Sequence, residues 1–258
     1  MMILCAHFIC IPLIWLMAKG AVKIITDKND LPQPPNQPMY LNNNMIEYPA
    51  AAIRLLIKEI ARCGKLTGEI IKASADMAGE DTSGVFSDIT EMTENEAKLK
   101  ISITEYISQL AASGTLTDEQ EAQITILISL LNDIERVGEV CFDTAVLLRD
   151  AEEMKFTISE FAGSELQFSL NILAVIYARI IEMMKGDCPE NMDVVLDLRE
   201  RLRAVVVNMR KSYMNSMENC KCSPEQTMLF NEIMSNISGL GNICLNMAGN
   251  AVQVVINR

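Results

Sequence analysis

Proline is distributed very unevenly along this chain of 258 residues, and its scarcity after residue 50 limits the possible folds more than any other feature. Six of the eight prolines precede residue 50, and only Pro189 and Pro224 follow it. Sandwiches and barrels usually need turns rich in glycine and proline, whereas a methionine-rich chain with few aromatic residues favours helices. We therefore predict an all-α protein.

The net charge of −12 and the single histidine exclude several functional classes. Nucleic-acid binding needs Lys and Arg clustered on one face, so we expect no nucleic-acid partner. With His7 as the only histidine, Glu-x-x-His iron sites and Ser/His/Asp arrangements cannot be built. A GxxxxGK[ST] phosphate loop is also absent from the sequence. We therefore predict that the protein is not an enzyme.

An apolar N-terminal run raises the question of a membrane. Residues 1–18 carry no charge, and as a helix they would span about 27 Å, close to the roughly 30 Å of a bilayer core. Lys19 and Lys23 follow the run, which places the remainder of the chain in the cytoplasm by the positive-inside tendency. We predict a transmembrane or membrane-docked helix over residues 1–25, with a helix buried against other protein as the alternative. The prolines in the segment that follows predict a proline-rich linker over residues 26–47.

Apolar residues recur every three or four positions in six later stretches, the pattern of amphipathic helices. Two stretches begin with a capping box, at residues 117–120 and 223–226, and the second box has a proline at the first helical position. Long helices with short connections form antiparallel bundles. We predict two tandem antiparallel three-helix bundles, over residues 48–154 and 155–258, preceded by the N-terminal hydrophobic helix.

The two predicted bundles are related by an internal repeat at an offset of 103 residues. The apolar frame is retained, because Ile134, Gly138 and Cys141 correspond to Ile237, Gly241 and Cys244. The carboxylates are not retained: the counterparts of Glu135 and Glu139 are Ser238 and Asn242. An upstream pair, Glu96 and Lys100, is aligned with two acidic residues, Asp193 and Asp197.

Carboxylates carry most of the chemistry that the sequence indicates. Glu135, Glu139 and Asp143 recur every four residues and share one face of a helix. Glu96 lies on an apolar seam, where an unpaired carboxylate is costly. Converging carboxylates need a cation, and hard oxygen ligands suit iron(III), manganese, magnesium or calcium. The alternative is that Lys100 or Arg136 neutralises them.

Residues 131–139, with the sequence LNDIERVGE, resemble the signature of PhoU-like domains. The segments at 60–65, 94–96 and 193–197 resemble other landmarks of that family. The passage from the apolar run through the prolines to residues 48–50 resembles the junction at which the sodium/phosphate cotransporter family enters its C-terminal cytoplasmic PhoU-like domain. The resemblance implies two three-helix bundles with iron, manganese or magnesium held by Glu96, Glu135, Glu139, Asp193 and Asp197.

The Gln-Ser-Ser-Ser motifs of that family's transport core do not occur in this chain. The resemblance therefore implies a regulatory domain for sodium-dependent phosphate transport, on the cytoplasmic side of the cell membrane. The expected partners are the membrane core of a phosphate transporter, the membrane itself through residues 1–25, and further copies of the chain in a homo-oligomer. The rival hypothesis is a self-associating helical scaffold whose carboxylates form salt bridges without a metal.

Overall fold

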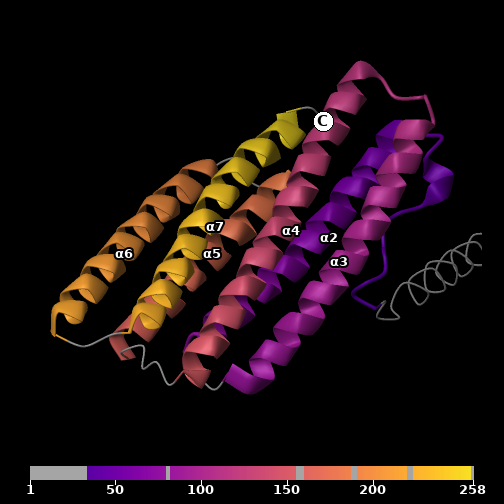
Figure 1. Cartoon of the computed structure of the whole chain (residues 1–258). Coiled ribbons are helices and arrows are strands. Elements are labelled where there is room, and N and C mark those ends of the chain that lie inside the picture. The colour runs from indigo at the N-terminus through magenta and orange to yellow at the C-terminus, as the bar shows by residue number, and fades with distance from the viewer. Residues whose placement is uncertain (1–33, 80–81, 155–159, 187–190, 220–222, 257–258) are drawn as a thin grey trace, which may run out of the picture. The chain divides into compact units, whose positions relative to one another are not determined.

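The computed structural model describes residues 34–79, 82–154, 160–186, 191–219 and 223–256, and their regular structure is entirely helical (Figure 1). The predicted helix over residues 1–25 and the first part of the predicted linker lie outside these ranges. In the described residues, one short 3₁₀ helix precedes six α-helices and no strand occurs. The prediction of an all-α protein is confirmed. The elements are η1 (Asn43–Met45), α2 (Pro49–Met77), α3 (Thr82–Ala112), α4 (Asp118–Glu153), α5 (Glu160–Lys185), α6 (Asn191–Asn219) and α7 (Pro224–Ile256).

The six helices pack as one helical bundle; for reference we call α2, α3 and α4 the first triplet and α5, α6 and α7 the second. Helices α2, α3 and α4 contact one another, and so do α5, α6 and α7. Two further contacts join the triplets, because α2 packs against α5 and α4 packs against α7 (Figure 1). The division into separate bundles over residues 48–154 and 155–258 stays a prediction.

Local chemistry sets the helix boundaries where the sequence predicts them. The Thr117 hydroxyl accepts a hydrogen bond from the Gln120 backbone N–H at 3.3 Å, and the Gln120 side chain accepts one from the Thr117 N–H at 3.1 Å. The same reciprocal pair, at 3.3 and 3.0 Å, joins Ser223 and Gln226 at the start of α7. Gly114 adopts a φ of 65° after α3, a conformation that favours glycine. Both predicted capping boxes are therefore confirmed.

The buried core follows the apolar residues that recur every three or four positions. On α7 eight such residues are all buried: Phe230, Ile233, Ile237, Leu240, Cys244, Met247, Ala251 and Val254. On α4, the sequence pattern places Ile128 in the seam, but its side chain is 40% exposed, while Leu127 and Leu130 are fully buried. Because an α-helix has 3.6 residues per turn, a seam extended in steps of four drifts away from the buried face.

Two described helices are long and apolar enough to cross a membrane by length and composition alone. They are the segment Gly163–Lys185 of α5 and the whole of α7. Both contribute fully buried residues to the core, for example Tyr177 and Ile237. Since the core helix of a helical bundle meets the same criteria, these two helices are weak evidence for a membrane span.

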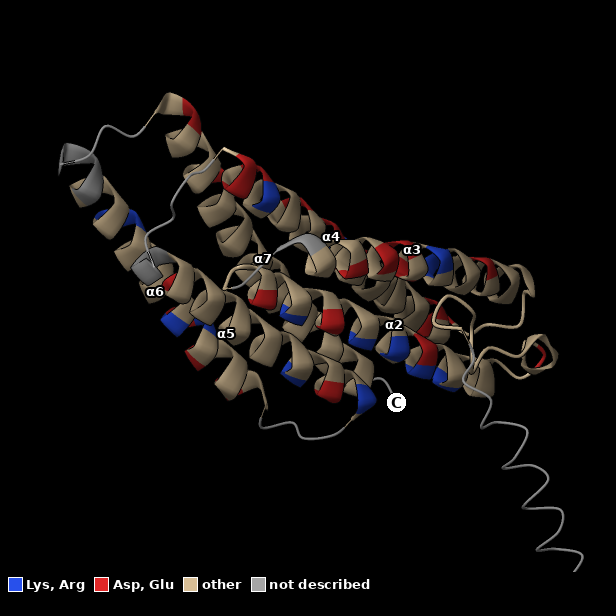
Figure 2. Cartoon of the chain, turned by 90° about the horizontal axis from the view of Figure 1, so that it is seen from below, with Lys and Arg blue, Asp and Glu red and all other residues tan. Residues whose placement is uncertain are grey.

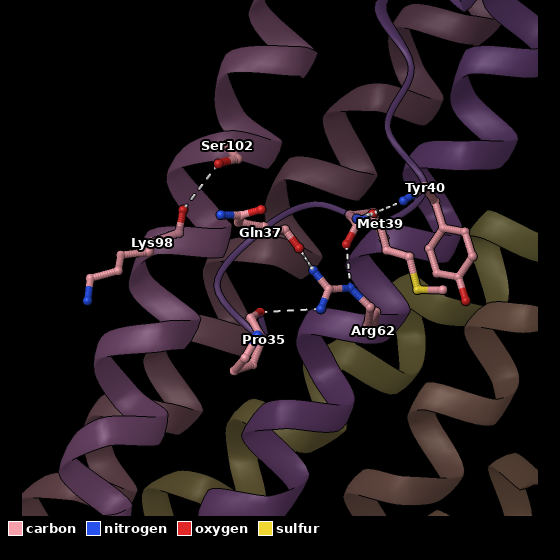
Figure 3. Close-up of polar contacts among 8 residues, drawn as sticks. Pro35, Gln37, Met39, Tyr40, Arg62, Lys98 and Ser102 are labelled. Carbon is pink, nitrogen blue, oxygen red and sulfur yellow. Dashed lines mark hydrogen bonds and ion pairs between the residues drawn. The ribbon is translucent and has the colours of Figure 1, made fainter. Parts of the chain in front are cut away.

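The described end of the predicted linker is bound to α2. The buried Glu59 carboxylate accepts hydrogen bonds from the backbone N–H groups of Met39, at 2.8 Å, and Tyr40. It also accepts one from Arg62 Nε at 2.6 Å, and Arg62 donates to the Pro35 carbonyl oxygen at 3.3 Å (Figure 3). Charge-assisted bonds of this kind satisfy a buried carboxylate. Glu59 and Arg62 therefore fasten the entering chain to the first long helix.

Candidate functional site

The buried carboxyl group of Glu96 is the centre of the candidate site, which lies between α2, α3 and α4. Glu96 is 3% exposed and projects from α3 toward Gly138 of α4. A Cβ atom at position 138 would lie only 2.2 Å from Glu96 Oε2, so only glycine leaves room for the carboxyl group there. Thr67 of α2 donates a hydrogen bond to Glu96 Oε1 at 2.7 Å. Each helix of the first triplet thus contributes one residue to the position of this carboxyl.

Burial raises the pKa of Glu96 from its ordinary value of 4.5 to about 8. Desolvation is the main cause, because it disfavours the charged form, and the negative charges of Glu135 and Glu139 act in the same direction. The hydrogen bond from Thr67 and the charge of Lys100 oppose the shift. Glu96 is therefore mostly protonated at neutral pH and exchanges its proton near pH 8.

A Lys–Glu ion pair lies beside Glu96. Lys100, one turn after Glu96 on α3, pairs with Glu135 of α4, and both side chains are partly buried. Of the two predicted neutralising residues, Lys100 makes the contact, whereas Arg136 is exposed. Glu139 is also exposed, and its charge acts on Glu96 from the same helix as Glu135. The structure therefore brings Glu96, Glu135 and Glu139 into one region, with Lys100 as its cation.

The two acidic residues predicted for the second half lie elsewhere. Asp193 and Asp197 are both exposed on α6, and Asp197 pairs with Arg201 of the next turn at 2.9 Å. The Gly138 counterpart, Gly241, faces Leu202: a Cβ atom there would lie 3.1 Å from Leu202 Cδ2. The residue of α6 that faces this glycine is therefore Leu202, whereas Asp193, aligned with Glu96 from the sequence, is exposed.

The second half has a groove where the first half has its ion pair. The groove has a volume of about 390 Å³ and runs between α6 and α7. Its floor is aliphatic and its rim carries three arginines; the lining residues are Arg199, Leu202, Arg203, Val206, Val207, Arg210, Ser238, Gly241 and Asn242. Ser238 and Asn242, the counterparts of Glu135 and Glu139, thus line this groove and do not form a carboxylate cluster.

Whether a metal ion fits the first half depends on the state of the three candidate carboxylate ligands. Glu96 is mostly neutral at pH 7, Glu135 is already paired with Lys100, and Glu139 is exposed. Within the described ranges, no group of three or more His, Cys, Asp or Glu side chains has an arrangement that could hold a metal ion. In this conformation Lys100 supplies the positive charge that a metal would supply, so the donor set fits a metal poorly.

Thr67 is the site residue that the sequence analysis does not single out. It is fully buried on α2 and bonds both Glu96 and, at 3.3 Å, the Cys63 carbonyl oxygen. The signal is present in the sequence: the seam of α2 steps by seven from Cys63 to Ile70, and position 67 fills the gap with a polar residue. A polar residue on a buried seam predicts a hydrogen-bond partner on a neighbouring helix.

No protein-family model matches this sequence, and no curated protein is significantly similar to it. The residues themselves therefore indicate what the site can do. A buried carboxyl with a pKa of about 8 can bind and release a proton near neutral pH, beside an ion pair that supplies both a positive and a negative charge.

Proposed function

We propose that this chain is a regulatory, non-enzymatic PhoU-like domain associated with sodium-dependent phosphate transport. One observation carries the proposal: Gly138, inside the segment that resembles the PhoU signature, receives the buried carboxyl of Glu96. A signature residue therefore has a specific structural task in this chain. The packing of the helices in two triplets further supports the proposal, because two successive three-helix bundles are what the resemblance implies.

In the proposed arrangement, residues 1–25 attach the chain to the cell membrane and the helical part lies on the cytoplasmic side. There it contacts the membrane core of a phosphate transporter and changes how readily that core opens. A regulator needs an element with two arrangements that a signal can bias. The ion pair between Lys100 of α3 and Glu135 of α4 is the element we assign to this role, with displacement of Lys100 by another cation as the proposed second arrangement.

Metal binding belongs to this proposal as its second arrangement. Iron, manganese or magnesium would be held by Glu96, Glu135 and Glu139 once Lys100 has moved away; a site at Asp193 and Asp197 would have to assemble from exposed side chains. Elemental analysis of protein purified without chelator tests this. We expect metal in the wild type and its loss in Glu135→Ala plus Glu139→Ala. The matched control is Glu94→Ala plus Glu105→Ala, which removes two exposed carboxylates from the same triplet.

The regulatory role is tested by co-expression of the full chain with a sodium/phosphate cotransporter core that lacks its own cytoplasmic domain. We expect the core to co-purify with the chain from detergent-solubilised membranes. We also expect sodium-dependent phosphate uptake to change when the chain is present. A full chain that is recovered wholly from the soluble fraction, without partners and without effect on uptake, would contradict the proposal.

The second candidate function is a self-associating helical scaffold without a metal. The Lys100–Glu135 ion pair favours it, because it neutralises Glu135 without any added ion. The elemental analysis separates the two functions. Metal that the wild type retains and the Glu135→Ala plus Glu139→Ala variant loses would contradict the scaffold, whereas metal-free protein with no transporter partner would support it.

A further inference from the structure

The outer face of α6 carries a line of exposed residues that share one side of the helix. Successive members are four, three, four, three and four residues apart, so their average spacing follows the 3.6-residue period of an α-helix. All six side chains are exposed; they are Leu196, Glu200, Arg203, Val207, Arg210 and Met214. The three apolar members are 42%, 43% and 67% exposed. We call this line the α6 seam.

The α6 seam is complementary to itself when a second copy runs antiparallel to it. With the two-fold axis placed at Val205, two of the three apolar residues meet each other and the acidic residue meets a basic one. The pairs are Leu196 with Met214, Glu200 with Arg210, and Arg203 with Val207 of the second copy. Two-fold symmetry repeats each pair, so the six positions form six layers. Only the Arg203–Val207 layers combine a charge with an apolar residue, and the arginine stem can cover that valine.

The parallel alignment lacks this complementarity. It would place each seam residue opposite its own copy, so Glu200, Arg203 and Arg210 would each face an identical charge. Like charges directly opposite each other destabilise a helix pair. The sequence of the seam therefore favours the antiparallel direction.

The groove between α6 and α7 lies along the same line. Three seam residues, Arg203, Val207 and Arg210, form part of its lining, and Ser238, Gly241 and Asn242 of α7 form the opposite side. Its volume of about 390 Å³ gives apolar side chains of an approaching helix a place to enter. Helices pack by inserting the ridge of side chains on one helix into a groove on the other, and the α6 seam offers both a ridge and an adjacent groove.

The local charge of the seam differs in sign from the net charge of −12 of the whole chain. Residues 199–211 contain five basic residues and one acidic residue, Glu200, so the Glu200–Arg210 pairs have to offset the repulsion between two segments that each carry +4. In the single chain, Arg199 bonds Glu200 at 2.8 Å, and Arg203 approaches it at 3.6 Å. In the pair, Arg210 of the second copy joins the same carboxylate. The repulsion between the distant acidic helices is screened, since the Debye length is about 8 Å at physiological salt.

We propose that α6 binds the α6 of a second copy in an antiparallel, isologous homodimer whose two-fold axis passes at Val205. The seam extends over about 27 Å of helix, so the interface is small for a stable dimer, and we expect a dissociation constant in the micromolar range. The dimer requires neither a metal nor a transporter. Its failure would therefore leave the proposed function untouched, and the reverse also holds.

A charge exchange within the seam tests the dimer. Glu200→Arg places like charges opposite each other in two layers, and so does Arg210→Glu, whereas the double variant Glu200→Arg plus Arg210→Glu restores opposite charges. We measure the dissociation constant of the full chain in detergent by sedimentation velocity over a dilution series. We expect each single variant to weaken the dimer roughly tenfold or more, and the double variant to return to within about threefold of wild type.

The matched control is Arg201→Glu, which changes the charge of the same helix by the same amount outside the seam. We expect it to dimerise like the wild type. Circular dichroism of every variant confirms that the helices form. The proposal is overturned when the wild type stays monomeric at about 200 μM, or when the double variant is no better than the single ones.

Cysteine pairing tests the direction of the two helices. Leu196→Cys and Met214→Cys place thiols about 27 Å apart within one chain, so a bond between them must join two chains. After mild oxidation of an equal mixture of the two single variants, we expect peptide mass analysis to find linkage between positions 196 and 214. Linkage of position 196 to position 196 instead, or no linkage at either position, contradicts the antiparallel pair.

Discussion

The crease between α3 and α4 and the crease between α6 and α7 are the lines along which these helices pack. Each has a glycine at a corresponding position, Gly138 or Gly241, but the side chains that face the two glycines differ in chemistry. In the first, Gly138 receives the carboxyl of Glu96. In the second, Gly241 receives the aliphatic side chain of Leu202. Because both glycines let a neighbouring helix come close, the backbone frame accepts either chemistry. The side chain opposite the glycine therefore decides whether the crease contains a titratable group or only an apolar contact.

The surfaces around the two creases differ in charge as well. Helix α4 carries ten acidic residues and two basic ones, whereas α6 carries five basic and four acidic residues. Figure 2 shows Asp and Glu along α3 and α4 with a few Lys and Arg among them, and both charge signs on α2. One half of the repeat therefore retains a carboxylate cluster, and the other presents arginines beside an open groove. Substitutions at the glycines and at the side chains opposite them test whether those side chains cause the difference.

The largest expected effect comes from Glu96→Gln, which replaces the buried titratable carboxyl with an amide that does not titrate. Below about pH 4.5 the carboxyl is protonated in both the folded and the unfolded chain. Between about 4.5 and 8 only the folded chain keeps the proton, so the free energy of unfolding falls as the pH rises. Each pKa unit corresponds to about 1.4 kcal/mol, so we expect a loss of a few kcal/mol in the wild type and none from this position in the variant.

Urea unfolding at pH 5 and pH 9 measures this difference. The control is Glu94→Gln, an exposed carboxylate on the same helix that pairs with Lys98 at 3.6 Å. It should leave the pH dependence of the wild type unchanged. Equal pH dependence in the wild type and in Glu96→Gln would mean that Glu96 does not hold its proton in the folded chain.

A smaller effect is expected from alanine at the two central glycines. Gly138→Ala puts a Cβ atom 2.2 Å from Glu96 Oε2, so the carboxyl must move and lose its bond from Thr67. We expect a cost of roughly 1–3 kcal/mol, although alanine is the better helix former by about 1 kcal/mol. At Gly241→Ala the nearest atom is Leu202 Cδ2 at 3.1 Å, and a small shift accommodates it. We expect that variant to be within about 1 kcal/mol of the wild type.

Chemical denaturation of both variants gives the comparison directly. A double-mutant cycle identifies the cause, because Gly138→Ala should cost little once Glu96→Ala has removed the carboxyl. Equal costs at the two glycines, or an unchanged cost in the Glu96→Ala background, would show that the clash with Glu96 is not responsible.

Much of the first crease could be predicted from the sequence, because local patterns determine it. The 3.6-residue period places Glu96 on the buried face of α3, and the capping box at Thr117 fixes where α4 begins. Lys100 lies one turn after Glu96, so its role as a neutralising residue could be foreseen. These features depend on residues close in sequence or on a single helical face.

The second crease and the anchored linker could not be predicted in the same way. Whether Leu202 or Asp193 faces Gly241 depends on how far α6 slides along α7, and an internal repeat does not fix that displacement. Glu59 is buried only because residues 39 and 40 fold back over α2 and supply their N–H groups. Such contacts follow from tertiary packing between distant segments, which periodicity does not encode.

The smallest expected effect concerns the ion pair that the second half lacks. A double-mutant cycle with Lys100→Met and Glu135→Gln measures the coupling energy, which we expect at about 0.5–1 kcal/mol, because both side chains are at least two-thirds buried. The control pair, Lys98 and Glu94, is more than half exposed on α3 and should give less. In about 1 M salt the control coupling should vanish, since the Debye length falls to about 3 Å, while part of the Lys100–Glu135 coupling should remain. Equal coupling in the two pairs would mean that the crease gives its ion pair no protection from water, and Lys100 would then be free to yield Glu135 to another cation.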